Sequence, residues 1–329
     1  MTSTIKKVYK NIYQVEVRLP DSPLKILNSY VIKDGKKGLI IDSGFNREES
    51  KIDFLSALDS LDIDLDQSFL VLTHLHSDHV GLAHLFQDKD RPIYASPLDG
   101  HMINFYTKKE NWQDILDQRK LFGMDENEVK LENHPGYVFG LKKAIDFIVL
   151  KDGEKITFGD YEFDILILPG HTPGHLALYD PKEKIFFGGD LVLDPITPNI
   201  TFWGFEYGDM LAHYLDSLDK IHDLDIRYIF PAHRKIIDNP KERTREIQDH
   251  HKRRNLEILA ALGEESLTVE EISSKISWRI KENNYYNFPP SQKWFATGET
   301  MAHLDYLTKE GLVEQDKINL CLYFKKTKK

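Results

Sequence analysis

Three histidines and an aspartate are packed into the six-residue motif HLHSDH at residues 74–79. The apolar run FLVL just before it is typical of a strand that is buried on both faces. In an extended segment His74 and His76 point to the same side, and Asp78 and His79 follow in the next turn. Neutral imidazole and carboxylate groups are ligands for zinc, iron or manganese. The spacing therefore predicts a metal site where this strand ends.

Three further candidate ligands each follow a later strand-like segment. His171 lies in the loop PGHTPGH, Asp190 follows the run IFFGG, and His233 follows YIFPA. Each would be a weak signal alone, but together with the first motif they favour one shared site. A carboxylate can bridge two cations with its two oxygens, which is the role considered for Asp190. His175, which opens the next strand, is interpreted as a structural neighbour of the site and not as a ligand.

The order of these ligands, each closing a β-strand, resembles the metallo-β-lactamase superfamily over about residues 10–240. The resemblance implies an α+β fold in which two sheets are sandwiched between helices, an αββα arrangement. It also implies that the early Asp42, in the segment IDSG, orients ligands without binding metal. The ligand set implied for the two ions is His74, His76 and His171 for the first, Asp78, His79 and His233 for the second, and Asp190 as the bridge.

The implied activity is that of a dinuclear metal-dependent hydrolase. We expect two divalent ions, zinc first, with iron and manganese as alternatives. Because a bound cation lowers the pKa of water to roughly 7, a metal-bridging hydroxide is the expected nucleophile. Asp78, which can orient the nucleophile, and Asp190 are the expected catalytic residues. The sequence suggests no serine or cysteine nucleophile.

Two departures from family patterns narrow this expectation. Flavodiiron relatives have a glutamate where this chain has His76, and a flavin domain follows; neither feature is present. Most zinc β-lactamases of the best-known subclass have a cysteine where this chain has Asp190. These departures argue against redox chemistry and against β-lactam hydrolysis as the main role.

The resemblance, together with the apolar patterns, implies three parts of the chain. Residues 1–240 are expected to form the catalytic domain, with residues 100–145 as an aromatic lid insertion, 241–263 as a connecting helix and 264–329 as a small C-terminal winged-helix-like domain. In the last domain, helices are expected over 269–276 and 298–308, followed by strands over 312–314 and 320–324. The other expected helices cover about 47–61, a segment starting near Gly81, 112–122 and 209–222.

Composition limits the class of protein. The net charge of −10 over 329 residues argues against a dedicated nucleic-acid-binding protein. With Cys321 as the single cysteine, no intrachain disulfide can form. No signal-peptide pattern and no apolar run of membrane-spanning length are found, so we expect a cytoplasmic protein without a membrane partner.

Two substrate classes stay open. The first is a small-molecule acyl substrate, namely a small ester, thioester or lactone, with the aromatic segment 202–207 either walling an acyl pocket or packing in the core. The alternative is a phosphodiesterase or endoribonuclease acting on single-stranded RNA, suggested by Lys252-Arg253-Arg254 and the winged-helix outline. Against it, residues 264–329 carry as many acidic as basic residues. Winged helices also serve in dimerisation, so a homodimer stays open. The complete ligand set argues against a non-catalytic interaction protein.

Overall fold

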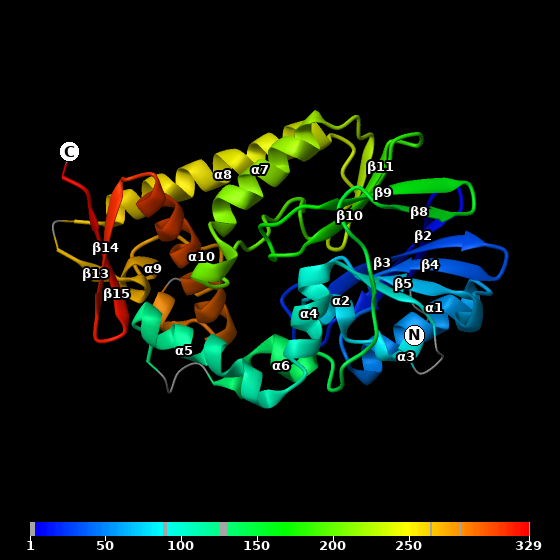
Figure 1. Cartoon of the computed structure of the whole chain (residues 1–329), viewed down its shortest axis with the longest axis horizontal. Coiled ribbons are helices and arrows are strands. Elements are labelled where there is room, and N and C mark those ends of the chain that lie inside the picture. Colours follow the sequence, from blue (N-terminus) through cyan, green and yellow to red (C-terminus); the bar gives the residue numbers. More distant parts are fainter. Residues whose placement is uncertain (1–3, 88–90, 126–129, 264, 283, 329) are drawn as a thin grey trace.

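The computed structural model describes residues 4–87, 91–125, 130–263, 265–282 and 284–328. Two β-sheets face each other, helices cover their outer sides, and a C-terminal group of helices and strands lies at one end (Figure 1). No helix among these residues combines the length and the apolar character needed to cross a membrane.

The first sheet brings the HLHSDH motif to one of its edges. Its strands pair in chain order, antiparallel from the first to the fourth and parallel from the fourth to the seventh. In the described residues they are β1 (Ile5–Tyr9), β2 (Ile12–Arg18), β3 (Ile26–Asp34), β4 (Lys37–Ile41), β5 (Phe69–Val71), β6 (Ile93–Ala95) and β7 (Ile148–Val149).

The second sheet carries the three later ligand candidates. Among the described residues, its strands are β8 (Lys155–Phe158), β9 (Tyr161–Ile167), β10 (Leu176–Asp180), β11 (Ile185–Gly189) and β12 (Tyr228–Pro231). They pair in the order β12-β11-β10-β9-β8. Only the β11–β12 pair is parallel among these, because the crossover through helix α7 (Met210–Asp223) returns the chain in the same direction.

The sandwich core follows from the alternation of side chains along the strands. Tyr30 and Val71 face the second sheet and pack in the core between the sheets. Their neighbours Val31 and Leu70 face the other way and pack beneath the outer helices of the first sheet. Because both faces of β5 are covered, its residues form the continuous apolar run seen in the sequence.

Most expected helices are present with small shifts at their ends. The helix expected near Gly81 begins earlier, at Ser77, because the amides of Val80 and Gly81 donate to the carbonyls of His76 and Ser77 and close a helical turn there. The described helices outside the C-terminal group are α1 (Glu48–Ser60), α2 (Ser77–Val80), α3 (His84–Gln87), α4 (Pro97–Phe105), α5 (Gln113–Phe122), α6 (Pro135–Phe139), α7 and α8 (Pro240–Ala261). Short 3₁₀ turns lie at Leu65–Gln67, Lys109–Trp112, Leu131–Asn133, Phe205–Tyr207 and Tyr285–Asn287.

The C-terminal group contains a longer helix than expected. Its elements are β13 (Leu267–Thr268), α9 (Val269–Ser273), α10 (Pro290–Lys309), β14 (Val313–Ile318) and β15 (Cys321–Lys326), with the strands paired in the order β13-β15-β14. The helix expected from Gly298 starts at Pro290, so Gly298 lies inside α10. A side chain there would lie 2.1 Å from Thr201 Oγ1, so the glycine allows α10 to approach that loop. The domain limits at 240 and 263 stay a prediction.

One apolar core joins this C-terminal group to the segment expected to be a lid. Phe122 of α5 packs in it with Trp294 and Leu304 of α10 and with Phe324 of β15. The rings of Phe122 and Trp294 lie 6.1 Å apart between centroids. Helix α8 contributes Ile258 to the same core. The last elements of the chain therefore share their interior with residues far earlier in the sequence.

Candidate metal centre

The candidate ligands follow the ends of four different strands. His74 follows β5, His171 follows β9, Asp190 follows β11 and His233 follows β12. All four side chains are buried, with exposed fractions of 1%, 5%, 6% and 0%. Strands that are far apart in the sequence therefore deliver polar side chains to one buried place.

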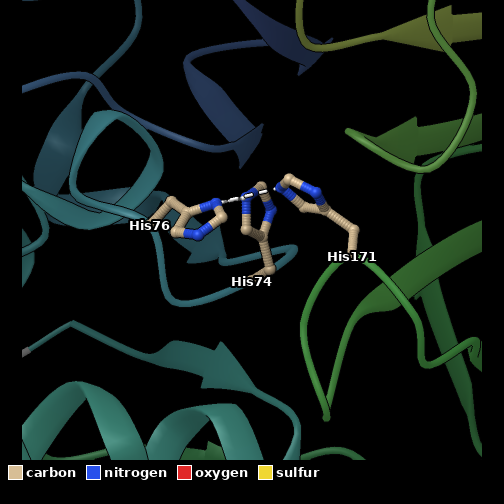
Figure 2. Close-up of side chains that lie close together, drawn as sticks. All are labelled: His74, His76 and His171. Atoms are coloured by element: carbon tan, nitrogen blue, oxygen red, sulfur yellow. Dashed lines mark hydrogen bonds between the residues drawn. The ribbon is translucent and has the colours of Figure 1, made fainter. Parts of the chain in front are cut away.

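His74, His76 and His171 form the first group of side chains (Figure 2). His74 Nε2 lies 3.0 Å from His76 Nδ1, and His171 Nε2 lies 2.9 Å from the same nitrogen. Figure 2 shows the three imidazoles turned toward one another, two from the segment after β5 and one from the loop after β9. These positions match the group expected for the first ion.

Asp78, His79 and His233 form a second group. Asp78 Oδ2 lies 3.3 Å from His233 Nε2 and 3.8 Å from His79 Nε2. Asp78 and His79 are in the first turn of α2, which explains how two consecutive residues reach the same group. This is the set expected for the second ion.

Asp190 lies between the two groups with one carboxylate oxygen toward each. Its Oδ2 is 3.7 Å from His171 Nε2 in the first group. Its Oδ1 is 3.7 Å from His79 Nε2 and 3.5 Å from His233 Nε2 in the second. A carboxylate in this position can contact two cations at once.

The ring orientation of the histidines is fixed by oxygens behind them. The Nδ1 atoms of His79, His171 and His233 each lie 2.8 Å from an oxygen that can only accept: Asp42 Oδ2, the Asn199 carbonyl and the Ile26 carbonyl. In the neutral imidazole each Nδ1 therefore carries the proton, which leaves the lone pair of each Nε2 facing the centre. Metal-binding histidines are oriented by outer partners in this way.

Asp42 reaches the site in the manner expected of a residue that orients ligands. Its Oδ1 accepts from the Thr73 amide at 2.9 Å and its Oδ2 from the Thr73 hydroxyl at 2.8 Å. Because that hydroxyl donates to Asp42, its oxygen is left to accept from His74 Nδ1 at 3.0 Å. One carboxylate thus orients His79 directly and His74 through Thr73.

Three buried atoms of the centre have no hydrogen-bond partner among the described residues. They are His79 Nε2, His233 Nε2 and Asp190 Oδ1. Leaving a buried polar group unpaired costs about 1–3 kcal/mol. Because these atoms face one another and are all electron-pair donors, a divalent cation fits the space that they surround.

Burial keeps the first group uncharged. Burial and the adjacent His171 lower the pKa of His76 to about 3. Burial is also the main cause that lowers the pKa of His74 and of His171. At neutral pH these imidazoles are therefore neutral, which is the form that binds metal.

The second group has the opposite electrostatic character. Burial raises the pKa of Asp78, but His79 and His233 outweigh it and lower this pKa to about 2. The same balance holds the pKa of Asp190 below its ordinary value, with His233 as the largest opposing influence. Burial lowers the pKa of His79 and of His233. The carboxylates that face them have the larger combined effect, so both pKa values are raised. This half of the site attracts positive charge, which a metal ion can supply.

Asp99 is a buried carboxylate that the sequence analysis missed. It accepts hydrogen bonds from the Leu75 amide at 3.0 Å, the Thr172 hydroxyl at 2.6 Å and the Gly174 amide at 2.6 Å. Burial raises its pKa to about 6, although these donors act in the opposite direction. Its sequence neighbourhood shows only that Asp99 lies three residues after the N-cap residue Ser96, which indicates the start of a helix. This pattern does not indicate a place beside the ligands.

His175 lies beside the centre, as interpreted, and belongs to neither group. Its ring stacks on His74 at 5.0 Å between centroids, and its Nε2 accepts from the Asp190 amide at 3.3 Å. The contact supports the backbone of one candidate ligand.

A cavity of about 630 Å³ opens onto the centre. His76, Asp78, His171 and Asp190 line it on one side. Its other walls come from residues 102–118 and 132–141, from the loop 193–203 and from the C-terminal elements. Within the aromatic segment 202–207, Phe202 and Trp203 line the cavity, and Phe202 also packs in the core. The indole of Trp203 stacks on the His76 ring at 5.9 Å and donates to the His171 carbonyl at 3.2 Å.

Comparison with known proteins identifies the family to which the chain belongs. A sequence model described as the metallo-beta-lactamase superfamily matches residues 24–233, which span all seven candidate ligands. The chain belongs to the metallo-beta-lactamase superfamily. This membership confirms the resemblance drawn from the ligand order and the sandwich fold that it implied.

Several known proteins align with most or nearly all of the chain. The beta-lactamase-like protein 2 homolog of Caenorhabditis elegans is 26% identical, with 87% of this chain and 80% of the relative covered. The probable metallo-hydrolase YqjP of Bacillus subtilis is also 26% identical, with 91% and 93% covered. A metallo-beta-lactamase family protein from Thermus thermophilus superposes with a TM-score of 0.83 at 24% identity, covering 98% of this chain and all of that one. At this identity the superposition shows the fold alone.

A thioesterase and a hydroxyacylglutathione hydrolase align over smaller parts of the chain. The atrochrysone carboxyl ACP thioesterase of Aspergillus fumigatus is 26% identical over 71% of this chain and 59% of its own. The hydroxyacylglutathione hydrolase GloC of Haemophilus influenzae is 29% identical over 59% of this chain and 80% of its own.

Proposed function

We propose that this protein is a metal-dependent hydrolase that binds two divalent ions, zinc in the first instance, and cleaves a small ester, thioester or lactone. The observation that carries the proposal is the pair of three-residue groups joined by the carboxylate of Asp190. Bare imidazole nitrogens on both sides and unpartnered buried atoms support two ions over one.

In the proposal, His74, His76 and His171 hold the first ion, Asp78, His79 and His233 hold the second, and Asp190 bridges them. When bound, divalent ions lower the pKa of water to roughly 7 and polarise a substrate carbonyl. The carboxylate of Asp78 lines the cavity, so it can accept a hydrogen bond from the attacking water and orient it. Asp42 keeps His79 in the tautomer that binds metal through Nε2.

The cavity supports an acyl substrate. Its walls include the aromatic side chains of Tyr106, Trp112, Trp203, Trp294 and Phe295. Such walls suit an apolar acyl group, while the polar end of the cavity suits its carbonyl. The relatives named as thioester hydrolases support a thioester as the first substrate to test. Residues 100–145, of which 126–129 lie outside the described residues, are proposed to cover the bound acyl group as a lid.

Phosphodiester hydrolysis of RNA is the weaker alternative. Of the basic run that suggested it, Lys252 and Arg253 are exposed on α8, but Arg254 is 7% exposed and paired with Glu257 at 2.7 Å. A continuous basic surface is what nonspecific RNA binding needs. The inward position of Arg254 interrupts that surface.

The test combines metal analysis with a substrate panel. We expect purified protein reconstituted with zinc to hold two ions per chain and to hydrolyse acyl thioesters, esters or lactones. A chelator should remove both the ions and the activity, and added zinc should restore them. A protein with two zinc ions that cleaved single-stranded RNA and no acyl substrate would overturn the substrate class. A protein that held no zinc, iron or manganese would overturn the metal centre.

A further inference from the structure

Asn199 connects the candidate ligand His171 to helix α10 of the C-terminal group. Its backbone carbonyl accepts from His171 Nδ1 at 2.8 Å. Its side-chain amide donates to Glu299 Oε2 at 2.9 Å and to the Phe295 carbonyl at 3.2 Å. The residue that sets the orientation of the imidazole is therefore itself held by α10.

Glu299 is fixed from its other side by α8. It is 8% exposed, and its Oε1 lies 3.5 Å from the Nε of Arg254, which is also buried. Arg254 in turn donates to the Ser277 carbonyl at 2.7 Å and lies over the ring of Trp278, with its Cζ 4.4 Å from the ring centroid. Because these contacts come from separate elements, the Glu299 side chain has little freedom to move.

The loop after Asn199 is attached to α10 and to His171 as well. The Phe202 amide donates to the Gly298 carbonyl at 3.1 Å, beside the close approach of Thr201 to Gly298. The Trp203 indole donates to the His171 carbonyl at 3.2 Å. The loop 199–203 therefore contacts His171 at both its imidazole and its backbone while being fastened to α10.

We propose that Glu299 and Asn199 are positioning residues for the metal centre, through which the C-terminal elements hold His171 in its metal-binding orientation. The inference rests on the proposed metal centre and adds a role for helices that the family match does not cover. The physical reason is that a histidine binds metal well only if its ring is already oriented. Loss of an outer partner of such a ligand costs about 10–100-fold in metal affinity or activity.

The experiment removes each link and measures zinc affinity by competition with a chelator. Asn199→Ala keeps the carbonyl that accepts from His171 but loses the amide that attaches it to α10. Glu299→Ala removes the acceptor of that amide. We expect each variant to weaken one of the two zinc-binding steps about tenfold, the lower end of the range for outer partners because neither side chain touches the imidazole. The absorption spectrum of the cobalt-substituted protein should change with it.

Two further variants separate positioning from general stability. Glu299→Gln keeps an oxygen that can accept from Asn199, so it should restore most of the zinc affinity. Thr300→Val is the matched control on α10. It removes the hydroxyl contact of Thr300 with Ser273 at 2.9 Å, inside the C-terminal group and away from Asn199. It should lower stability in urea without changing zinc affinity or the cobalt spectrum.

The positioning role of Asn199 and Glu299 can fail while the proposed hydrolase function stands. If Asn199→Ala and Glu299→Ala bind both zinc ions as tightly as the parent, with the same cobalt spectrum, the positioning role is overturned and the hydrolase proposal stands. Equal weakening by Thr300→Val would also overturn it, because any destabilised C-terminal group would then have the same effect. If Glu299→Ala does not fold, Asn199→Ala and Glu299→Gln still decide. A parent protein that binds no zinc would overturn the metal centre first, and this inference with it.

Discussion

The hydroxyl of Thr172 donates a hydrogen bond of 2.6 Å to the carboxylate of Asp99, across 73 residues of sequence. The same carboxylate accepts from the amides of Leu75 and Gly174. Leu75 separates His74 from His76, and Thr172 follows His171, so Asp99 holds together the two loops that supply the first group of ligands. The spacing of these imidazoles therefore depends on a carboxylate that belongs to neither ligand group.

Asp99→Asn should lower both stability and zinc affinity. The new NH2 group would replace either the oxygen that accepts from Leu75 and Thr172 or the oxygen that accepts from Gly174. In both cases a donor would face a donor, and at least one buried group would be left unpaired. We expect a loss of about 1–3 kcal/mol in the free energy of unfolding, measured by urea denaturation, and weaker zinc binding. Asp146→Asn, at an exposed carboxylate, is the control. An unchanged denaturation midpoint in Asp99→Asn would contradict the role assigned to these bonds.

Asp190→Ala should lower the metal content and abolish hydrolysis together. The substitution removes the carboxylate that faces both groups and leaves their lone pairs without a shared neighbour. We expect fewer than two zinc ions per chain by metal analysis and no measurable turnover, with the far-UV circular dichroism spectrum retained. Asp225→Ala, at an exposed carboxylate paired with Lys184, should keep both properties. Full activity in Asp190→Ala would remove the assigned site.

The contact between α8 and α10 should weaken in acid. His251 Nδ1 lies 3.2 Å from His303 Nε2, and burial lowers the pKa of both, that of His251 to about 3 with His250 and Arg254 adding to the effect. A histidine with a lowered folded pKa stabilises the fold above its unfolded pKa of about 6.5 and loses that contribution as the pH falls. We expect the free energy of unfolding to fall between about pH 6.5 and about pH 3, by up to about 1.4 kcal/mol per pH unit for each group.

His303→Gln tests this pH dependence. Glutamine can still donate to Asn255 Oδ1, which His303 Nδ1 contacts at 2.6 Å, but it does not titrate. Urea unfolding at about pH 5 and about pH 7.5 should therefore show a smaller difference in the variant than in the parent. His101→Gln, at an exposed histidine, should keep the parental difference. A variant with the full parental slope would assign the acid sensitivity to other groups.

Phe295→Ala should change substrate preference without changing the metal centre. The side chain lines the cavity, while the contact with Asn199 uses its carbonyl, which the substitution keeps. The substitution would remove apolar contact between the ring and a long acyl chain, which is worth about 1.4 kcal/mol of binding free energy. We therefore expect KM for long acyl chains to rise about tenfold, with kcat little changed. An acetyl thioester should be much less affected. Leu256→Ala, 66% exposed on α8, is the control. Equal effects on short and long chains would contradict an acyl-binding wall.

The sequence predicted the parts of the site that depend on local pattern. The apolar runs of β5, β11 and β12 place their following residues at sheet edges, so His74, Asp190 and His233 could be found from strand and ligand type together. Their meeting then follows from the sandwich. The early Asp42 came from the family resemblance, and its contact with His79 agrees with that expectation.

The residues that were missed act through contacts between distant segments. Asp99 has the local pattern of a helix-start residue and Asn199 that of a loop residue, and neither spacing points to a histidine. The start of α10 was misplaced because glycine usually marks a helix boundary, whereas Gly298 is required inside the helix by the approach of Thr201. Edge strands β1 and β13 were also missed, since short or lysine-containing segments become strands only when a partner is available.

The apolar core shared by α5, α10 and β15 limits how the chain of this enzyme can be truncated and how its segments can be exchanged with those of relatives. A fragment trimmed to the family match at residues 24–233 would retain Phe122 but lose Trp294 and Phe324, leaving one side of α5 without its packing partners. Exchanging the C-terminal third for that of another family member would require matching the facing surface of α5 as well. We therefore expect residues 24–233, although they match the superfamily, not to fold as a stable domain without the C-terminal elements.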